Sequence, residues 1–385
     1  MDIRMAQSCA TEARQAVEEF HRAVAQPSTE LVMFFCSSEY DLDVLAAEMN
    51  RLFAGIQVVG CTTAGEIGPA GYRQHSLSGV SFPAGSFATV SGLLDRLSQF
   101  DIARGNDFAQ TMLQRLESRV PGAGPDNSFA FMLIDGLSIR EELVAHVLQH
   151  ALGNITLSGG SAGDDLKFKK TCIYCDGRFH SDSAALILVN TSLPFRIFKT
   201  QHFVSTDERL VVTEADPARR IVKEINGLPA AAEYARVLGV DVNELNSTNF
   251  AVSPVVVIID GTDYVRSIQK ANPDGSLTFF CAIDEGLIFR VAHGVDLVNN
   301  LEQTFDKIRA EIGQPQLAIS CDCILRNLEV SNNGLKDRVG EIFRHNNTIG
   351  FSTYGEQFHG VHINQTLTGI AIGAAPEATQ EPRDV

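Results

Sequence analysis

The fold is decided by a stretch that the chain contains twice, GCTTAGE at residues 60–66 and GFSTYGE at residues 350–356. Ten residues beyond each glutamate a second pair of blocks matches, SLSGVSF at 76–82 and TLTGIAI at 366–372. Both pairs are offset by 290 residues without a gap, which chance alignment rarely gives at two separate places. Self-similarity of this kind predicts an internal duplication. A shorter third version, GGSAGD, stands at residues 159–164.

The rest of the chain alternates short apolar runs with amphipathic segments, which is typical of a mixed α/β fold. We predict two related α/β domains, residues 1–220 and 221–385, with a disordered tail from about residue 374. In the first half the expected strands are 31–36, 57–61, 77–82, 87–93, 129–134, 155–158, 184–189, 196–204 and 210–214, with helices at 41–53, 108–119 and 139–152. In the second half we expect strands at 255–260, 265–269, 277–281, 317–321 and 366–372, a helical stretch after Asp216-Pro217 and a helix at 298–312.

Composition excludes several classes of partner. The 385 residues carry 31 Lys and Arg against 47 Asp and Glu, a net charge of −16, which repels phosphate backbones and anionic lipid. No apolar run approaches the roughly 20 residues that cross a bilayer, and the start of the chain lacks the apolar core of a signal peptide. The eight cysteines, several in apolar strand-like runs, fit reduced buried thiols. We therefore expect a cytoplasmic protein that binds neither nucleic acid nor membranes.

The glycine stretches have two open interpretations. Glycine and serine are ordinary residues of turns that reverse strands, so each loop can be a turn and nothing more. Alternatively, the loops converge on one ligand pocket, where hydroxyls and carboxylates would contact a small molecule. The candidate pocket residues are Gly60, Thr62, Thr63, Glu66, Ser161, Ser352, Thr353, Tyr354 and Glu356.

The chain resembles the FIST family of sensory proteins, with an N-terminal half at about 28–220 and a C-terminal half at about 221–365. The motifs that carry the resemblance are VGCTTAGE at 59–66, SGGSAGDD at 158–165, INGLPA at 225–230, TYGE at 353–356 and HINQT at 362–366. The stretch FFCSSEYDL at 34–42 is similar to the haem-binding, nitric-oxide-sensing NosP branch of that family.

The resemblance implies a sensor that binds haem b, takes up a small diatomic ligand, nitric oxide, and regulates a histidine kinase or a cyclic-di-GMP enzyme. Such an enzyme would be a diguanylate cyclase or a phosphodiesterase. The alternative is a haem-free FIST module that binds a small molecule such as an amino acid.

A haem sensor needs a neutral imidazole on one face of the iron. His362 is the first candidate because it lies in the HINQT segment, between the second glycine stretch and the final strand. His75 and His359 have comparable settings and are the runners-up. His146 and His150 are spaced like metal ligands, but they fall on the polar face of the helix expected at 139–152.

An enzymatic function is not expected. GGSAG at 159–163 satisfies the G-x-S-x-G pattern of serine hydrolases, and Asp260 and His362 follow in hydrolase order. A nucleophile elbow must open a helix, however, whereas residues 164–168 lead into another strand-like run. Covalent haem attachment is also excluded, because CIYC at 172–175 is followed by Asp176 where attachment requires histidine.

Overall fold

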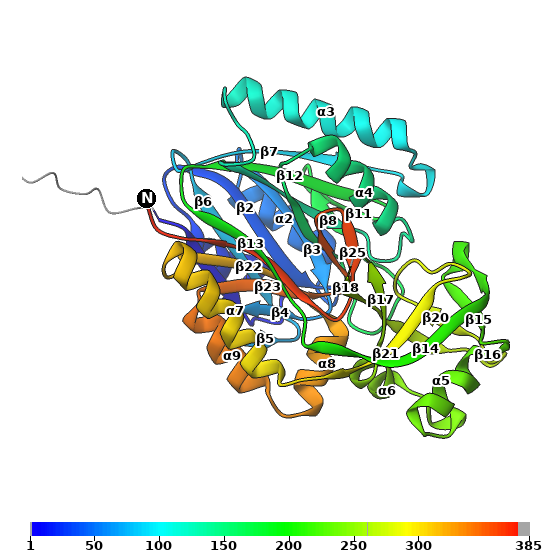
Figure 1. Cartoon of the computed structure of the whole chain (residues 1–385). Helices are drawn as coiled ribbons and strands as arrows, with labels where there is room; N and C mark the ends of the chain where they lie inside the picture. Colours follow the sequence, from blue (N-terminus) through cyan, green and yellow to red (C-terminus); the bar gives the residue numbers. More distant parts are fainter. Residues whose placement is uncertain (1, 260, 376–385) are drawn as a thin grey trace, which may run out of the picture.

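A computed structural model describes residues 2–259 and 261–375, and the tail expected to be disordered lies largely outside this range. The mixed α/β class is confirmed. The described residues form three six-stranded sheets and one eight-stranded sheet. Figure 1 shows the three smaller sheets packed in the middle of the molecule with helices outside them, and the larger sheet standing to one side.

Three parts of the chain repeat one order of elements: strand, helix, strand, helix, strand, hairpin, strand, with two helices in place of the second helix in the third part. The first repeat is β1 (Arg4–Ser8), α1 (Ala13–Val24), β2 (Thr29–Ser37), α2 (Leu42–Leu52), β3 (Gln57–Thr63), β4 (Glu66–Gly68), β5 (Gly71–Arg73) and β6 (Leu77–Pro83). The second is β7 (Phe87–Leu94), α3 (Ile102–Arg119), β8 (Ser128–Ile134), α4 (Glu141–Leu152), β9 (Leu157–Ser161), β10 (Ile173–Cys175), β11 (Arg178–His180) and β12 (Ala184–Thr191). The third is β13 (Phe195–Thr200), α7 (Leu297–Ile312), β22 (Leu317–Cys323), α8 (Ile324–Asn332), α9 (Lys336–His345), β23 (Thr348–Thr353), β24 (Glu356–Phe358), β25 (Val361–Ile363) and β26 (Leu367–Ile372).

The internal repetition predicted from the sequence is therefore confirmed, and the structure adds a third copy. The matching blocks at 60–82 and 350–372 are the strand, hairpin and returning strand of repeats one and three, and GGSAGD marks the same place in repeat two.

Backbone geometry at the start of the returning strands confirms this equivalence. In each repeat a non-glycine residue with positive φ precedes that strand: His75 at 56°, Asp182 at 50° and Gln365 at 51°. The carbonyl oxygen of the residue that follows it accepts a hydrogen bond from a backbone N–H at the end of the repeat's central strand, which is β2, β8 or β22. The bonds are Ser37 N–H to Ser76 O (3.1 Å), Asp135 N–H to Ser183 O (2.9 Å) and Cys323 N–H to Thr366 O (3.1 Å). Positive φ is uncommon outside glycine, so its recurrence at one position marks three copies of one unit.

The three repeats exchange their hairpins in a closed cycle. The β4–β5 hairpin pairs with β23 of repeat three, β24–β25 pairs with β9 of repeat two, and β10–β11 pairs with β3 of repeat one. Each of the three six-stranded sheets thus contains a parallel central pair and a hairpin from another repeat. Strands from both sides of residue 220 share three of the four sheets in the described part, so residues 1–220 and 221–385 do not form separate sheets.

One apolar core joins the inner faces of the three sheets. Repeat one contributes Phe35, which stacks on Phe351 of repeat three with ring centroids 4.6 Å apart, and Phe131 represents repeat two in the same cluster. The outer faces pack on separate helix pairs, α1 with α2 and α3 with α4, and on α7 with α9. Because both faces of these sheets are buried, the strands read as apolar runs rather than as strict alternation.

Residues 203–294 interrupt the third repeat and form an inserted unit with its own sheet and core. Its elements are β14 (Phe203–Asp216), β15 (Ile221–Ile225), β16 (Leu228–Pro229), α5 (Ala230–Leu238), α6 (Ser247–Val252), β17 (Val255–Ile259), β18 (Thr262–Arg266), β19 (Ile268–Ala271), β20 (Leu277–Phe279) and β21 (Ile288–Gly294). The chain enters and leaves at neighbouring points, since Val295 N–H donates to His202 O at 2.7 Å.

Three sequence expectations for this region were wrong. The strand expected at 265–269 breaks at Ser267, and its two parts, β18 and β19, lie at opposite edges of the eight-stranded sheet. The strand expected at 196–204 breaks at residues 201–202, so β13 and β14 belong to different sheets. The stretch directly after Asp216-Pro217 is a short 3-10 turn followed by β15, and the helix α5 begins only at Ala230. Arg220, which ends this turn with a positive φ of 55°, donates to Glu141 at 2.6 Å and also to Glu142. This buried ion pair connects the inserted unit to α4. It holds Arg220 in a left-handed conformation, which a helix cannot continue.

Candidate functional site

The three glycine loops meet where the parallel strand pairs end. Ligands of open α/β sheets bind at the carboxyl ends of such strands. Here backbone hydrogen bonds join the loops of all three repeats into one ring. They are Ala64 N–H to Ser352 O (2.9 Å), Ser352 N–H to Gly65 O (2.7 Å), Ser161 N–H to Gly355 O (2.9 Å) and Gly163 N–H to Thr62 O (3.0 Å). We call residues 62–66, 161–165 and 352–356 the loop ring.

The candidate pocket residues are thus brought together, but their side chains are buried. Within the loop ring, Thr63 and Thr353 have the same task, because each Oγ1 accepts from the glycine N–H two residues on, at 3.3 and 3.0 Å. Direct contact of these nine residues with a ligand stays a prediction. All of them lie in the interior: Gly60, Thr62, Thr63, Glu66, Ser161, Ser352, Thr353, Tyr354 and Glu356.

The glutamates of the two glycine stretches, Glu66 and Glu356, connect each loop by hydrogen bonds to the start of the returning strand. Glu66 accepts from Ser76 through both its N–H (3.0 Å) and its hydroxyl (2.7 Å). Glu356 accepts from Thr366 in the same way, at 3.3 and 2.6 Å. Burial raises the pKa of Glu66 to about 8 and that of Glu356 well above its usual range. Burial therefore favours the protonated form of both carboxyls. The constant spacing of ten residues to Ser76 and Thr366 was the sequence signal for these hydrogen bonds.

A cavity of about 150 Å³ lies beside the loop ring, and we call it the loop pocket. Asn327 ties the pocket to the ring, because its Nδ2 donates to Ser352 Oγ at 2.7 Å. Burial raises the pKa of Asp165, while the ammonium of Lys167, 3.5 Å away, lowers it. The lining is half polar and half apolar: Ala64, Gln74, Asp165, Leu166, Ile324, Asn327, Leu328 and Ser331. Sequence reasoning missed the four α8 residues in this set, because nothing in their pattern separates them from an ordinary helix.

Asp164 holds the loop that forms one wall of this pocket. It is 3% exposed and accepts hydrogen bonds from the backbone N–H groups of Phe168 (2.9 Å), Lys169 (2.8 Å) and Lys170 (2.8 Å), as well as from the Tyr354 hydroxyl. The loop therefore turns tightly around one carboxylate, which places Asp165 and Leu166 at the cavity.

His362, the first candidate for a haem ligand, lies in β25 and packs against the inserted unit. Gln357 Nε2 lies 3.1 Å from its Nδ1, and Arg266 donates to its carbonyl oxygen at 3.3 Å. Within the described residues its Nε2 makes no hydrogen bond, although the Phe280 carbonyl lies close enough to favour the protonated ring. Burial lowers the pKa of the imidazole to about 4, so it is neutral at pH 7.

The surroundings of His362 do not fit a haem in this conformation. A Cβ placed on Gly355 would lie only 2.5 Å from His362 Nε2 and 3.0 Å from Asn364 Nδ2, so backbone already covers the nitrogen that would bind iron. The neighbours Gln357, Asn364 and Arg266 are polar or charged, whereas a haem needs an apolar slot. Among the described residues, no three His, Cys, Asp or Glu side chains converge as metal ligands either.

The two runner-up histidines occupy turns. His75 is the positive-φ residue of repeat one; its ring packs edge-on against Tyr40 at 4.7 Å and Nε2 lies 3.2 Å from Thr11 O. His359 and Gly360, with φ of 51° and 76°, form the two-residue turn of the β24–β25 hairpin, where type I′ geometry needs two positive φ values. Burial and the charge of Lys199 lower the pKa of His359. Both histidines therefore have a structural reason for their positions.

Ser161 lacks the geometry of a nucleophile. It ends β9, and the chain continues into the Asp164 loop rather than into a helix. Gln357 Nε2 donates to Ser161 Oγ at 2.9 Å and stands between this serine and His362. Asp260, the third member of the hypothetical triad, lies outside the described residues.

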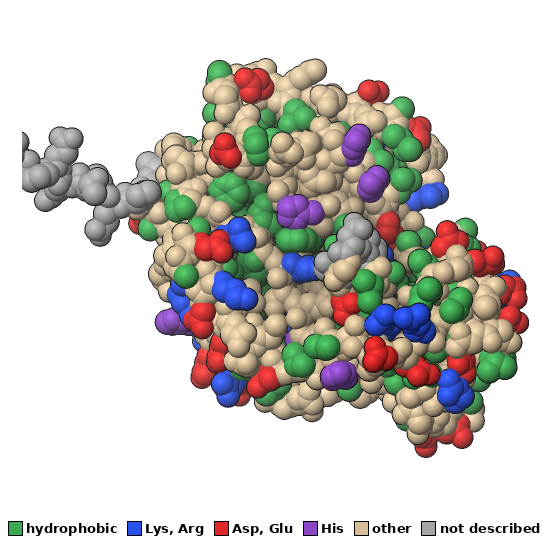
Figure 2. Space-filling model, viewed as in Figure 1, with side chains coloured by type: hydrophobic (Ala, Val, Ile, Leu, Met, Phe, Trp, Pro, Cys, Tyr) green, Lys and Arg blue, Asp and Glu red, His purple; other side chains and the backbone are tan. Residues whose placement is uncertain are grey.

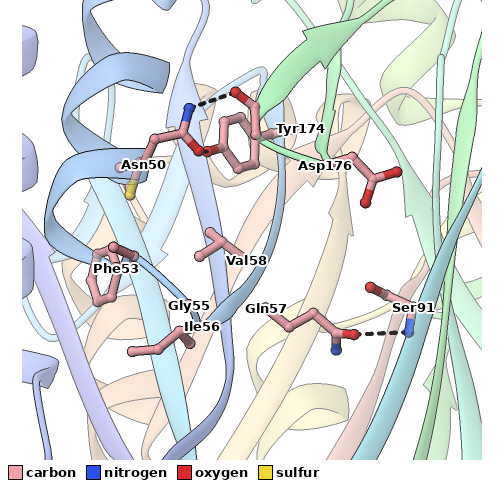
Figure 3. Close-up of a pocket in the computed structure, with 12 residues that line it drawn as sticks. Asn50, Phe53, Gly55, Ile56, Gln57, Val58, Ser91, Tyr174 and Asp176 are labelled. Carbon is pink, nitrogen blue, oxygen red and sulfur yellow. Dashed lines mark hydrogen bonds between the residues drawn. The ribbon is translucent and has the colours of Figure 1, made fainter.

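A second cavity, of about 200 Å³, lies where the β10–β11 hairpin of repeat two packs on repeat one (Figure 3). Asn50 of α2 donates to Gly177 O at 2.7 Å and accepts from the Tyr174 hydroxyl at 3.0 Å, so it holds the tip of the β10–β11 hairpin. The tip glycines of the other two hairpins, Gly360 and Gly71, likewise lie against Gln149 of α4 and Arg344 of α9. Because this arrangement recurs in all three repeats, we assign the cavity to the architecture rather than to a ligand.

Comparison with family models decides the relationship. The FIST N domain matches residues 30–228 and the FIST C domain matches residues 230–359. The chain belongs to the FIST family. FIST domains are sensory domains of signal-transduction proteins. No helix in the described part of this FIST protein has the length and apolar character needed to cross a membrane.

No curated protein matches the chain. Two solved structures resemble it over most of its length. The first is described as "Cyanuric acid hydrolase: evolutionary innovation by structural concatenation", with 10% identity, a TM-score of 0.37, and coverage of 97% of this chain and 99% of that one. The second is the cyanuric acid hydrolase from A. caulinodans, with 9% identity, a TM-score of 0.33 and the same coverage.

Proposed function

We propose that this FIST protein is a non-enzymatic cytoplasmic sensor that binds a small molecule in the loop pocket. The observation that carries the proposal is the convergence of all three glycine loops at the carboxyl ends of their strands, next to a cavity of about 150 Å³. A cavity of this size holds roughly a benzene-sized molecule. Its half-polar lining, with an amide at Asn327 and a carboxyl at Asp165, suits a compound such as a small amino acid. The eight cysteines, all free thiols, support a reducing compartment.

Filling the loop pocket is expected to abolish ligand binding. Ser331 lines the cavity from α8, and phenylalanine at this position would occupy the space that the ligand needs. A thermal-shift screen of amino acids and similarly small metabolites, followed by titration calorimetry, should give a ligand whose Kd rises at least ~10-fold in Ser331→Phe. Thr111→Phe is the matched control, because Thr111 is an exposed α3 residue whose hydroxyl bonds the carbonyl four residues back, as that of Ser331 does. Equal binding by the two variants contradicts the assignment.

A haem-based nitric oxide sensor is the second candidate, favoured by one observation: His362 offers a neutral imidazole with an unbonded, buried Nε2. The β24–β25 hairpin and the inserted unit enclose His362, so they would have to separate before a haem could reach its Nε2. A bound haem would supply an iron that takes up nitric oxide. Gln357 Nε2 donates to His362 Nδ1, which leaves the proton of the neutral ring on Nε2, so this side-chain amide would also have to turn before Nε2 could bind iron.

This candidate predicts a spectral result that the first does not. Adding haem to the purified protein should give a haem–protein absorption band that His362→Ala abolishes and His146→Ala leaves unchanged. A band that survives in His362→Ala would eliminate His362 and move the assignment to His75 or His359, and no band in the unaltered protein removes the candidate. In either case the regulated enzyme is proposed to be a histidine kinase, a diguanylate cyclase or a phosphodiesterase, in keeping with the sensory role of the family.

A further inference from the structure

The inserted unit carries an unusual share of exposed apolar surface. Among the described residues, seven of the twelve exposed large hydrophobic side chains lie in residues 203–294, which make up less than a quarter of the chain. Isolated exposed hydrophobic residues need no explanation, but clusters of them mark interaction sites. Two of the seven, Val211 and Ile288, are 36% and 49% exposed and face each other directly across β14 and β21.

The next pair on the same face of the sheet is Arg209 opposite Arg290. Like charges directly opposite on neighbouring strands destabilise a sheet. Within the described part of the chain the nearest carboxylate to Arg290 is that of Asp207, 3.8 Å away and fully exposed, and Arg209 makes no ion pair there. The residues between the two rows, Leu210 and Phe289, point the other way into the core of the inserted unit. The face therefore presents a two-by-two patch, one row aliphatic and one row cationic.

The patch continues a buried part of the same face of the inserted unit's sheet. Val256, the neighbour of Arg290 on β17, is fully buried in a small cluster with Phe203, Val265 and Ala292. In Figure 1, β14 and β21 are turned towards the viewer, and Figure 2 shows Lys and Arg side chains gathered at this place among hydrophobic and acidic ones. The covered part of the face thus continues into an open part at Arg209, Val211, Ile288 and Arg290.

We propose that this patch docks a partner protein through a segment that carries a carboxylate and an aliphatic side chain on one face. The carboxylate would lie between Arg209 and Arg290 and relieve their repulsion, since guanidinium groups bind carboxylates with charge-assisted hydrogen bonds. The aliphatic side chain would cover Val211 and Ile288. The rows are two residues apart along the strands, about 7 Å, which equals the spacing of alternate residues in an extended segment.

A peptide titration tests the match in charge and spacing. Fluorescence anisotropy would follow the binding of a labelled peptide, TDTLTDTLTD, to the full chain, beside TKTLTKTLTK and TDTNTDTNTD. We expect the first peptide to bind and the other two to bind at least ~10-fold more weakly. The same loss is expected for the first peptide when Arg209→Glu and Arg290→Glu are combined, and when Val211→Ser and Ile288→Ser are combined.

Lys270→Glu is the matched control, because it reverses an exposed positive charge on β19 of the same unit and should leave affinity within about twofold. Equal affinity for the lysine peptide, unchanged binding by the double variants, or no binding of TDTLTDTLTD at millimolar concentration each overturns the proposal. A dimer in size-exclusion chromatography that dissociates in the arginine double variant also overturns it, since the patch would then join two copies of this chain.

Discussion

Replacing Glu66 by alanine is expected to lower the free energy of unfolding by about 3–5 kcal/mol. Glu66 is fully buried and accepts hydrogen bonds from the N–H and the hydroxyl of Ser76 and from the Thr63 hydroxyl. Removal of the carboxyl takes away the acceptor of both Ser76 donors and leaves the Thr63 hydroxyl only the Cys36 carbonyl, 3.4 Å away. Urea denaturation measures the effect, and Glu117→Ala on the exposed face of α3 is the control, for which little change is expected.

The same residue makes stability depend on pH. Burial raises the pKa of Glu66 in the folded state to about 8, above its value in the unfolded chain. The folded state therefore holds a proton that the unfolded state releases, so this contribution is complete below about pH 4.5 and is lost as pH rises through 8. Glu66→Gln imitates the protonated carboxyl and should match the unaltered protein at acidic pH but exceed its stability at pH 9. Equal stability of the two at pH 9 would mean that folding does not raise the pKa of Glu66.

Replacing Asp164 by alanine is expected to remove both ligand binding and about 3–4 kcal/mol of stability. Three backbone N–H groups and the Tyr354 hydroxyl donate to this carboxylate, and the loop they fix supplies Asp165 and Leu166 to the loop pocket. Tyr354→Phe removes one of these donors and should cost about 1 kcal/mol. Urea denaturation and ligand titration of both variants check this. If Asp164→Ala is as stable as Tyr354→Phe and binds ligand normally, the loop is not held by Asp164.

The repetition could be predicted because two copies kept the same residues at the same spacing. Repeats one and three share glycines, hydroxyls and a glutamate over 23 positions, and each of these has a structural task in the turn. Repeat two kept only the glycine turn: the Asp164 loop separates its β9 from its hairpin, and Ile173 stands at the pairing position that Glu66 and Glu356 fill elsewhere. One short glycine stretch is too common to reveal a third copy.

The hairpin exchange and the loop pocket could not be predicted from the residues. Strands such as β4, with three residues, have no pairing preference that a sequence pattern would show, so their partners are set by tertiary packing. The inserted unit is a sheet placed inside repeat three, and its apolar runs look like a continuation of the same α/β pattern. His362 illustrates the limit for sites: the HINQT segment was recognisable, but its contacts with Gln357 and Arg266 depend on the inserted unit that packs on it.

Hydrogen–deuterium exchange of the full chain, with and without a ligand found in the screen, tests the central claim most directly. We predict that bound ligand slows exchange in residues 163–170 and in α8, because both line the loop pocket and their amides open to solvent when the cavity is empty. Slowed exchange only around the β24–β25 hairpin and His362, with none in α8, would contradict the account and place the ligand at the seam with the inserted unit.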